Sequence, residues 1–500
     1  YQPSGDVKAA LSVTSETCKG PSCKQYQECY VTLAKRRAKK ADAIVANHAL
    51  FAVDTMLGGG YLPRDAVVVI DECHEMPETV AERFGAELRF GHGRNRETGS
   101  IAAFADAAAR IMVDPRTSTL AGKHRSIREH LQERAKMVAT GELKSARLRK
   151  GLASDKRLAE LLEESRLLIE EIRDSLGEVP VMTEDAQLTR DGACRQGDNL
   201  LEAIKILTTV EQGQVAYTET DGGSQVIKLI DVRIAPKLRR AQWTRPEDRY
   251  DDEEDEDDFE RRDADEEQSE HRVPRCVILC SATVPDNFEE LVGLDAGEDG
   301  LPAARRVSVA APFDYRKRTL LYLPTELPSP KRGTARAHRA AVQAEMLELA
   351  EAALAQDKGV LMLCSSFQAV HGTEDNDFED GFAAPLGRLA ERMGARLFVD
   401  GQAPKNEIIA QVKRCNRFVL VASQGFFTGV DLPGQVALVG IDKAPLPTPD
   451  DPVVSGYREL CGGRDVFTRV DVPLTAAKLG QAAGRLNRSL NDAGVVAIFD

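Results

Sequence analysis

Two adjacent carboxylates follow a short apolar run near the start of the sequence, in VVVIDECHE (67–75). The run Val67–Ile70 is typical of a strand in the middle of a parallel sheet, and open α/β folds bind ligands at the carboxyl ends of such strands. There Asp71 is suited to hold Mg²⁺, largely through its waters, and Glu72 to orient or deprotonate an attacking water. The alternative is a solvated turn. The pair predicts half of a nucleoside-triphosphate site, provided that the rest of the chain agrees.

A second group suited to phosphate lies in QAAGRLNRS (481–489). Gln481, Arg485 and Arg488 are spaced at i, i+4 and i+7, which predicts one face of a helix. Gly484 would let that face approach another segment closely. Guanidinium groups bind phosphate and stabilise the charge that develops during phosphoryl transfer. Taken alone, this segment also fits a solvated amphipathic helix.

The segment SQGFFTGVDLPG (423–434) follows an apolar strand and carries two glycines around an aromatic pair. The main-chain N–H groups of such a loop can contact a nucleic-acid backbone and couple it to a nucleotide. We predict that Phe426 and Phe427 contact DNA and that Gly429 and Asp431 contact the nucleotide. A tight turn with packed aromatic side chains is the alternative.

A short hydroxyl-bearing motif, CSAT (280–283), ends a second apolar run. We expect Ser281 and Thr283 to hydrogen-bond the acidic motif. The alternative is that they only cap the next helix.

These motifs need strands and helices to position them, and the sequence predicts both. Residues 42–51 suggest a strand leading into a short helix, 155–178 an amphipathic helix, and 214–234 a β-hairpin. From about residue 336 onwards helices and strands alternate, which favours a parallel sheet with covering helices. The expected fold is therefore α/β, with two parallel-sheet units flanking a mainly helical insertion.

Charge and cysteine content limit the class of protein. The formal net charge is −14, but residues 247–270 hold 16 acidic and 3 basic residues, so the acidity is one local run that we predict to be a disordered surface loop. No run of about 20 apolar residues occurs that would span a membrane. The 10 cysteines are mostly scattered, which favours a reducing compartment.

One cysteine cluster, Cys18-x4-Cys23-x5-Cys29, has no histidine nearby. A chance cluster, a disulfide and a zinc site are alternatives, but zinc needs four ligands, and unevenly spaced cysteines suit an iron–sulfur centre. A basic run follows it and is predicted to bind the phosphates of a single DNA strand, with a solvated helix face as the alternative. Its bases are Lys35, Arg36, Arg37, Lys39 and Lys40.

In their order along the chain, the four motifs resemble those of superfamily 2 helicases, specifically the DinG-type relatives of XPD. The resemblance implies two RecA-like domains with an inserted iron–sulfur segment and a helical arch. The implied division is an iron–sulfur segment at 1–35, a first RecA-like domain at 36–84 and 271–300, an arch at 85–270 with its acidic loop at 246–270, and a second RecA-like domain at 301–500.

The same resemblance implies an ATP-dependent DNA helicase that travels 5′→3′ on single-stranded and forked DNA in repair or replication, as a monomer in the bacterial cytoplasm. ATP and Mg²⁺ would bind in the cleft between the RecA-like domains. Asp71, Glu72, Gln481, Arg485 and Arg488 would serve hydrolysis. The residues implied to couple hydrolysis to DNA movement are His74, Ser281, Thr283 and Asp431. Cys18, Cys23 and Cys29 would be the last three ligands of a [4Fe–4S] cluster.

The sequence departs from the family pattern at several points. No G-x4-G-K-[ST] phosphate loop occurs, and AGKH (121–124) lacks its first glycine and its hydroxyl residue. We expect that loop and the first cluster cysteine upstream of Tyr1, so the 500 residues alone should not hydrolyse ATP. Thr428 and Asn487 replace residues more usual in the family. Two alternatives stay open: the helicase part of an exonuclease–helicase fusion, and a degenerate DNA-binding or redox-sensing relative without ATPase activity.

Overall fold

The structure is a computed structural model of the whole chain. It describes all residues except 1–17, 19, 60–61, 64–65, 92–99, 144, 247–271, 296–301, 312, 330–332, 373–380, 428 and 464. The predicted acidic loop and the side chain of Lys39 therefore lie outside the described residues. The chain divides into two compact units. Unit 1 comprises Tyr1–Ser281, Asn287–Ala304 and Thr448–Arg464, and unit 2 comprises Ala282–Asp286, Arg305–Pro447 and Asp465–Asp500.

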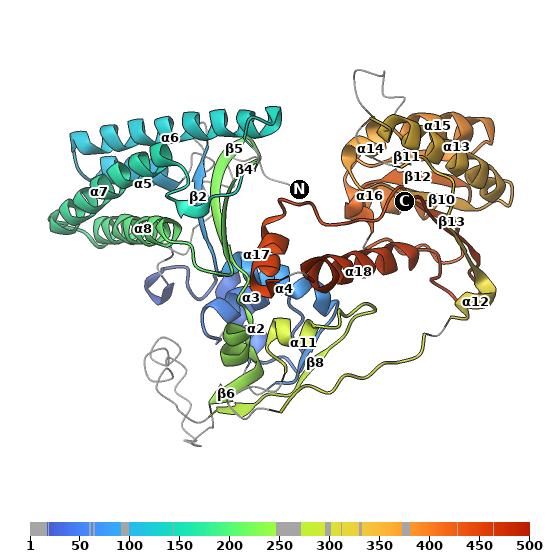
Figure 1. Cartoon of the computed structure of the whole chain (residues 1–500). Coiled ribbons are helices and arrows are strands. Elements are labelled where there is room, and N and C mark those ends of the chain that lie inside the picture. Colours follow the sequence, from blue (N-terminus) through green and yellow to red (C-terminus); the bar gives the residue numbers. More distant parts are fainter. Residues whose placement is uncertain are drawn as a thin grey trace. The chain divides into compact units, whose positions relative to one another are not determined.

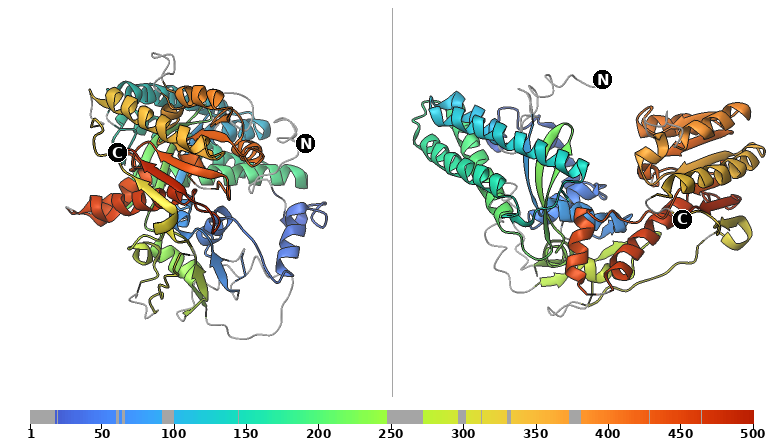
Figure 2. Two further views of the ribbon diagram at one scale, coloured as in Figure 1. Left: turned by 90° about the vertical axis from the view of Figure 1, so that its right-hand side faces the viewer. Right: turned by 45° about the horizontal axis from the view of Figure 1, so that its top comes forward.

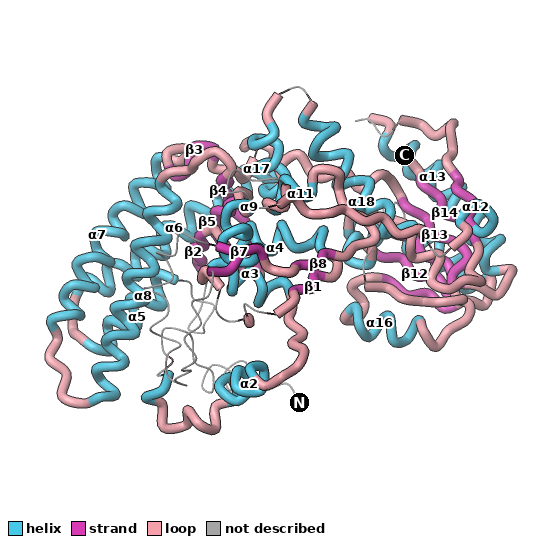
Figure 3. Tube along the Cα trace, turned by 90° about the horizontal axis from the view of Figure 1, so that it is seen from below, coloured by secondary structure: helices cyan, strands magenta, loops and turns pink. Residues whose placement is uncertain are grey.

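A two-stranded parallel sheet in unit 1 carries the acidic motif. Strand β1 (Val68–Ile70) pairs with β8 (Val277–Leu279), and Figure 3 shows the two side by side. Helices α3 (His48–Met56) and α4 (Met76–Arg83) flank the motif in the sequence. The predicted strand is present, but the expectation of burial on both faces is wrong for the described residues. Side chains alternate along a strand, so Ile70 is buried, whereas Val69 on the other face is 62% exposed.

The insertion in unit 1 packs four helices against a three-stranded antiparallel sheet (Figures 1 and 2). The helices are α5 (Ser100–Ile111), α6 (Pro115–Thr140), α7 (Lys156–Glu178) and α8 (Glu184–Thr208). The sheet has the order β2 (Ala86–Phe90), β5 (Ser224–Asp231), β4 (Gln214–Asp221). The predicted hairpin is confirmed and turns at Gly222 and Gly223, whose φ angles are +55° and +83°.

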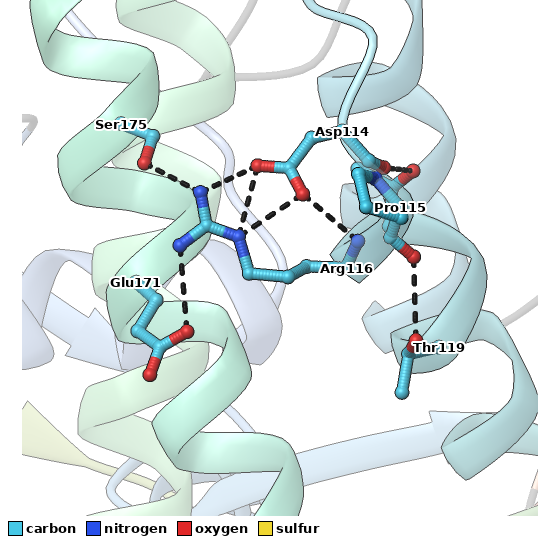
Figure 4. Close-up of polar contacts among 7 residues, drawn as sticks. Asp114, Pro115, Arg116, Thr119, Glu171 and Ser175 are labelled. Carbon is cyan, nitrogen blue, oxygen red and sulfur yellow. Dashed lines mark hydrogen bonds and ion pairs between the residues drawn. The ribbon is translucent and has the colours of Figure 1, made fainter.

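A polar cluster ties α6 to α7 in this insertion (Figure 4). Asp114 accepts a hydrogen bond from the main-chain N–H of Arg116 at 2.8 Å and so caps α6. The guanidinium of Arg116 bonds the Asp114 carboxylate and reaches Ser175 and Glu171 of α7. The two helices are therefore held by a charged contact as well as by their apolar stripes.

Shorter elements complete unit 1. Strands β6 (Thr244–Pro246) and β7 (Arg272–Pro274) pair antiparallel on either side of the acidic run. Further elements of this unit include α2 (Tyr30–Lys39), β3 (Arg149–Leu152), α9 (Ala235–Leu238), α11 (Phe288–Val292) and α17 (Pro452–Cys461). The predicted strand within 42–51 is absent, because residues 41–47 are exposed coil, whereas the helix that follows is confirmed.

Unit 2 is built on a six-stranded parallel sheet of order β11-β12-β10-β13-β14-β9, which confirms the α/β class. Its strands are β9 (Thr319–Tyr322), β10 (Gly359–Leu363), β11 (Arg396–Val399), β12 (Phe418–Ala422), β13 (Val436–Ile441) and β14 (Gly494–Ile498). Its helices are α12 (Tyr315–Arg318), α13 (Ala335–Leu354), α14 (Phe367–His371), α15 (Ala383–Arg392), α16 (Lys405–Val412) and α18 (Val472–Ala483).

Helices cover both faces of this sheet, as the strand composition predicts. Successive residues of β10 enter different cores: Val360 and Met362 pack with α13 and α15, whereas Leu361 and Leu363 pack with α16 and the end of α18. This sheet places the loops after its strands at one edge. Among the described residues, no helix combines the length and apolar character that crossing a membrane requires.

Candidate functional site

The two predicted acids lie directly at the carboxyl end of β1. Asp71 and Glu72 are both exposed, and the Asp71 carboxylate accepts a hydrogen bond from the main-chain N–H of Glu72 at 3.0 Å. Glu72 has a φ of +47° and a ψ of +45°, the left-handed region that non-glycine residues rarely occupy. Such strain is typical of functional sites, where the surrounding structure holds it in place. The turn directs two carboxylates towards solvent at a sheet edge.

The hydroxyl motif after β8 contacts the acidic motif after β1 through Ser281, as predicted for that residue, whereas the contact predicted for Thr283 stays a prediction. The Oγ of Ser281 lies 2.7 Å from Nδ1 of His74 and 3.4 Å from Oε2 of Glu72. The same Nδ1 is 3.4 Å from Glu72 Oε2. The contact follows from the parallel pairing, because the strands end together and the N–H of Cys73 donates to the carbonyl of Cys280 at 3.0 Å.

The sequence did not predict a role for two further residues at this site. His48, near the start of α3, places Nε2 3.0 Å from the carbonyl oxygen of Asp71. The only local signal is the helix start itself, where Asn47 caps α3 by accepting from the N–H of Leu50. Cys73 is fully buried beneath the turn, and burial raises the pKa of its thiol to about 11. Cys73 thus supports the turn as a neutral, packed side chain.

The second hydroxyl residue, Thr283, belongs to unit 2 and lies beside α18. A Cβ added at Gly480 would come within 3.0 Å of Thr283 Cγ2. Gly480, rather than the predicted Gly484, is thus the glycine that allows a close approach. A Cβ at Gly484 would meet only main-chain oxygens of its own segment, at 3.1 and 3.5 Å.

The prediction that Gln481, Arg485 and Arg488 share a helical face is wrong, because α18 ends at Ala483. A turn follows, which the buried amide of Asn487 stabilises: it accepts from the distant Thr319 Oγ1 at 2.8 Å and donates to the carbonyl of the nearby Asp492 at 3.1 Å. Asn487 therefore has a structural role in this turn.

The two arginines of this turn have different surroundings. Arg485 donates to the carbonyl of Val430 at 2.8 Å and to that of Gln481 at 3.1 Å. Arg488 approaches Asp431 at 3.8 Å, and its buried Nε makes no hydrogen bond with the residues that the structure describes. A buried N–H without an acceptor is costly, so this Nε has a hydrogen bond left to give to an acceptor.

The loop after β12 packs its aromatic side chains inward. Phe426 and Phe427 are 2% and 3% exposed, so their rings cannot contact DNA in this conformation, and the packed-turn alternative describes them. Gly425 and Gly429 are exposed, Gly429 has a φ of +71°, and Thr428 lies outside the described residues. Lys405 donates to the carbonyl of Gly425 at 2.6 Å and supports the loop. Asp431 remains 66% exposed at the loop's end.

The cysteine segment has the donor chemistry for a metal centre, but its described residues do not form an assembled site. Cys18 is exposed, Cys23 and Cys29 are half-buried, and the described residues contain no grouping of three potential metal ligands. Hydrogen bonds from Thr32 and Val31 at the start of α2 hold the pKa of the Cys29 thiol below its ordinary value. A thiolate is the form that binds metal, so Cys29 fits a ligand's role.

The basic run lies on and just after α2. Its bases Lys35, Arg36, Arg37 and Lys40 are exposed, and Arg36 donates to Gln27 at 2.6 Å. The AGKH segment lies inside helix α6, where Lys123 pairs with Glu164. A helical backbone has no free N–H groups to surround phosphates, so AGKH is not a phosphate loop.

Comparisons with known proteins agree with the motifs. Residues 349–500 match the Helicase C-terminal domain family. The chain is 25% identical to the ATP-dependent DNA helicase YoaA of Escherichia coli, over 99% of this chain and 72% of that protein. It is also 25% identical to the ATP-dependent helicase DinG of Mycobacterium tuberculosis, over 98% of this chain and 66% of that protein.

Among solved structures, one titled XPD helicase aligns over 95% of this chain and 72% of its own, with a TM-score of 0.49 and 15% identity. These sequence matches show that the chain is similar to ATP-dependent helicases along nearly its whole length. Within that class, the predicted resemblance to DinG-type helicases is confirmed.

Proposed function

We propose that this protein is an ATP-dependent DNA helicase. The observation that carries the proposal is the convergence of Asp71, Glu72, His74 and Ser281 at the carboxyl ends of two adjacent parallel strands. The similarity to proteins named ATP-dependent DNA helicases supports it.

Each group at the strand ends has a chemical role in this proposal. Asp71 is the residue that would hold Mg²⁺, which neutralises charge on the nucleotide phosphates when bound. Glu72, held in its unusual backbone conformation, orients and deprotonates the attacking water. Arg488, with Arg485 and Gln481 in the same segment, stabilises charge on the transferred phosphoryl group. Gly429 and Asp431 contact the nucleotide from the neighbouring loop.

Coupling and DNA binding are assigned to other surfaces. His74, Ser281, Thr283 and Asp431 connect the state of the nucleotide to DNA movement. The exposed bases around α2 bind DNA phosphates, and the main chain of residues 425–429, rather than the rings of Phe426 and Phe427, contacts the DNA backbone. From the resemblance we also propose that the protein acts on single-stranded and forked DNA and travels 5′→3′. By the same resemblance it is a monomer with a role in repair, in the bacterial cytoplasm.

The proposed function also includes an iron–sulfur cluster in the cysteine segment. Cys18, Cys23 and Cys29 would hold a [4Fe–4S] cluster together with a fourth ligand. The depressed pKa of Cys29 supports a thiolate at that position. These residues keep the segment folded next to the basic run of α2.

The test is ATP hydrolysis by the full-length protein carrying Glu72→Gln. Loss of a general base lowers kcat by roughly 10²- to 10⁴-fold, whereas ATP binding should persist because the substitution keeps shape and hydrogen bonding. Glu82→Gln, an exposed glutamate on α4, is the matched control and should retain full activity. Turnover near the unsubstituted rate in Glu72→Gln would remove the assigned base.

A further inference from the structure

Asp492 is a buried carboxylate that no motif includes. It is 5% exposed and lies in the turn between α18 and β14. Its Oδ1 accepts from the N–H of Gly434 at 2.9 Å and from the hydroxyl of Ser489 at 2.6 Å. Its Oδ2 accepts from the N–H groups of Arg488 and Ser489, both at 2.7 Å. Both oxygens are thus fully used by donors from two different loops.

A carboxylate suits this position better than a neutral side chain. Burial alone would raise the pKa of Asp492, but the hydrogen bonds from Ser489, Arg488 and Gly434 outweigh it and hold the pKa below its ordinary value. The group is therefore ionised at neutral pH, and all four of its partners donate. An amide could supply only one acceptor oxygen and would direct its own N–H₂ group at main-chain N–H groups.

The bonded groups are the ends of two functional segments. Gly434 closes the loop that carries Asp431, and Arg488 carries the guanidinium beside Asp431. Because α18 ends at Ala483, no helical hydrogen bond fixes the main chain of Arg488. Asp492 supplies that restraint, and the direction of the Arg488 side chain depends on it.

We propose that Asp492 is a positioning residue that holds Arg488 against the loop of Asp431, so that its guanidinium is aimed before nucleotide arrives. This inference rests on the proposed function, because it requires Arg488 to act on phosphate. Preorganised charge is worth most in catalysis when it needs no rearrangement at the moment of reaction.

A double-mutant cycle in the full-length protein tests the inference. Asp492→Asn and Arg488→Ala should each lower the kcat of DNA-stimulated ATP hydrolysis by at least about tenfold, with the KM for ATP changed by less than about threefold, because the interaction belongs to the transition state. The double variant should be no slower than Arg488→Ala alone, because Asp492 acts only through that arginine. Asp114→Asn, which makes the same change to a carboxylate in the insertion that also accepts from a main-chain N–H, should leave kcat unchanged.

The possible results distinguish a failure of the positioning role of Asp492 from a failure of the proposed role of Arg488. A slow Arg488→Ala together with a fully active Asp492→Asn, or multiplicative losses in the double variant, would refute the positioning role alone. Full activity of Arg488→Ala would refute the role of Arg488 and the inference with it. If Asp492→Asn does not fold, Ser489→Ala replaces it, since it deletes only the hydroxyl donor. It should lower kcat by about threefold in the parent protein and not at all in the Arg488→Ala background.

Discussion

The Nδ1 of His74 lies 2.7 Å from the Oγ of Ser281, although the two residues are 207 positions apart in the sequence. The same hydroxyl is 3.4 Å from the carboxylate of Glu72, the proposed base. One side chain at the end of β8 therefore contacts both Glu72 and His74 after β1. A change at the acidic motif can reach β8, and the segment that follows it, through this contact.

Ser281→Ala should separate hydrolysis from unwinding. The substitution removes the link between His74 and β8 but leaves Asp71 and Glu72 in place, so DNA-stimulated ATP hydrolysis should stay within about threefold of the parent. Base pairs unwound per ATP should fall by about tenfold. Both rates are measured on the same forked duplex, with Ser175→Ala in the insertion as the control. Equal losses in the rates of ATP hydrolysis and of unwinding would show that Ser281 serves the hydrolysis step and not its coupling to DNA movement.

Patterns within a single element allowed correct predictions. Helix α7 buries Leu158, Leu161, Leu162, Ser165, Ile169, Ile172 and Leu176, the stripe that its 3.6-residue periodicity predicts. The hairpin and the strand–helix alternation of unit 2 are equally local patterns. The order of the four motifs predicted the resemblance to helicases, which the sequence matches confirm.

The wrong predictions concern positions whose local structure depends on residues outside the motif itself. The end of α18 depends on Thr319 and Asp492, which bond the turn from outside the helix, so the spacing of the arginines suggested a face that does not form. Aromatic residues in a loop can face solvent or the core, and only the packing of α16 and β12 shows that Phe426 is buried. His48 approaches Asp71 from another element, and no periodicity predicts such a contact.

Cys73 should resist alkylation while the protein is folded. Its pKa is raised to about 11, so at pH 8 the thiol is almost entirely protonated, and the reactive thiolate accumulates only as the pH approaches 11. Iodoacetamide at pH 8 should modify the exposed Cys280 first and reach Cys73 only after unfolding in urea. Peptide mass spectrometry distinguishes the two sites. Comparable labelling of both in the native protein would contradict the burial of Cys73 beneath the turn.

Cys23→Ser should remove the proposed iron–sulfur cluster. Full-length protein purified without oxygen should be brown and contain about four iron atoms per chain, the number in a [4Fe–4S] cluster. The variant should lose both the colour and the iron, and it should no longer unwind DNA. Cys415→Ser, which replaces a half-buried cysteine of unit 2, is the control and should retain the colour and the iron. Zinc without iron in the native protein would contradict the assignment.

The acidic run should be dispensable for folding. Strands β6 and β7 pair with Pro246 opposite Arg272, so the described residues that flank the run lie side by side, and a short glycine–serine linker can replace it. Replacing residues 247–270 in this way should change the melting temperature by less than about 2 °C, because a run so rich in acids has little apolar surface to bury. The affinity for DNA, measured by fluorescence anisotropy at fixed salt, should also be almost unchanged. A large gain in affinity would instead identify an autoinhibitory acidic lid.

Strand separation by the full-length protein tests the helicase assignment most directly. The substrate is a forked duplex with a 5′ single-stranded tail and a fluorophore–quencher pair at the junction, observed with ATP, with a non-hydrolysable analogue, and with the Glu72→Gln protein. We predict unwinding only by the parent protein with ATP, and faster unwinding from a 5′ tail than from a 3′ tail. Binding of Glu72→Gln to the same fork should be unchanged. Unwinding by the parent with the analogue, or by Glu72→Gln at the parent rate, would contradict an ATP-driven motor built on Asp71 and Glu72.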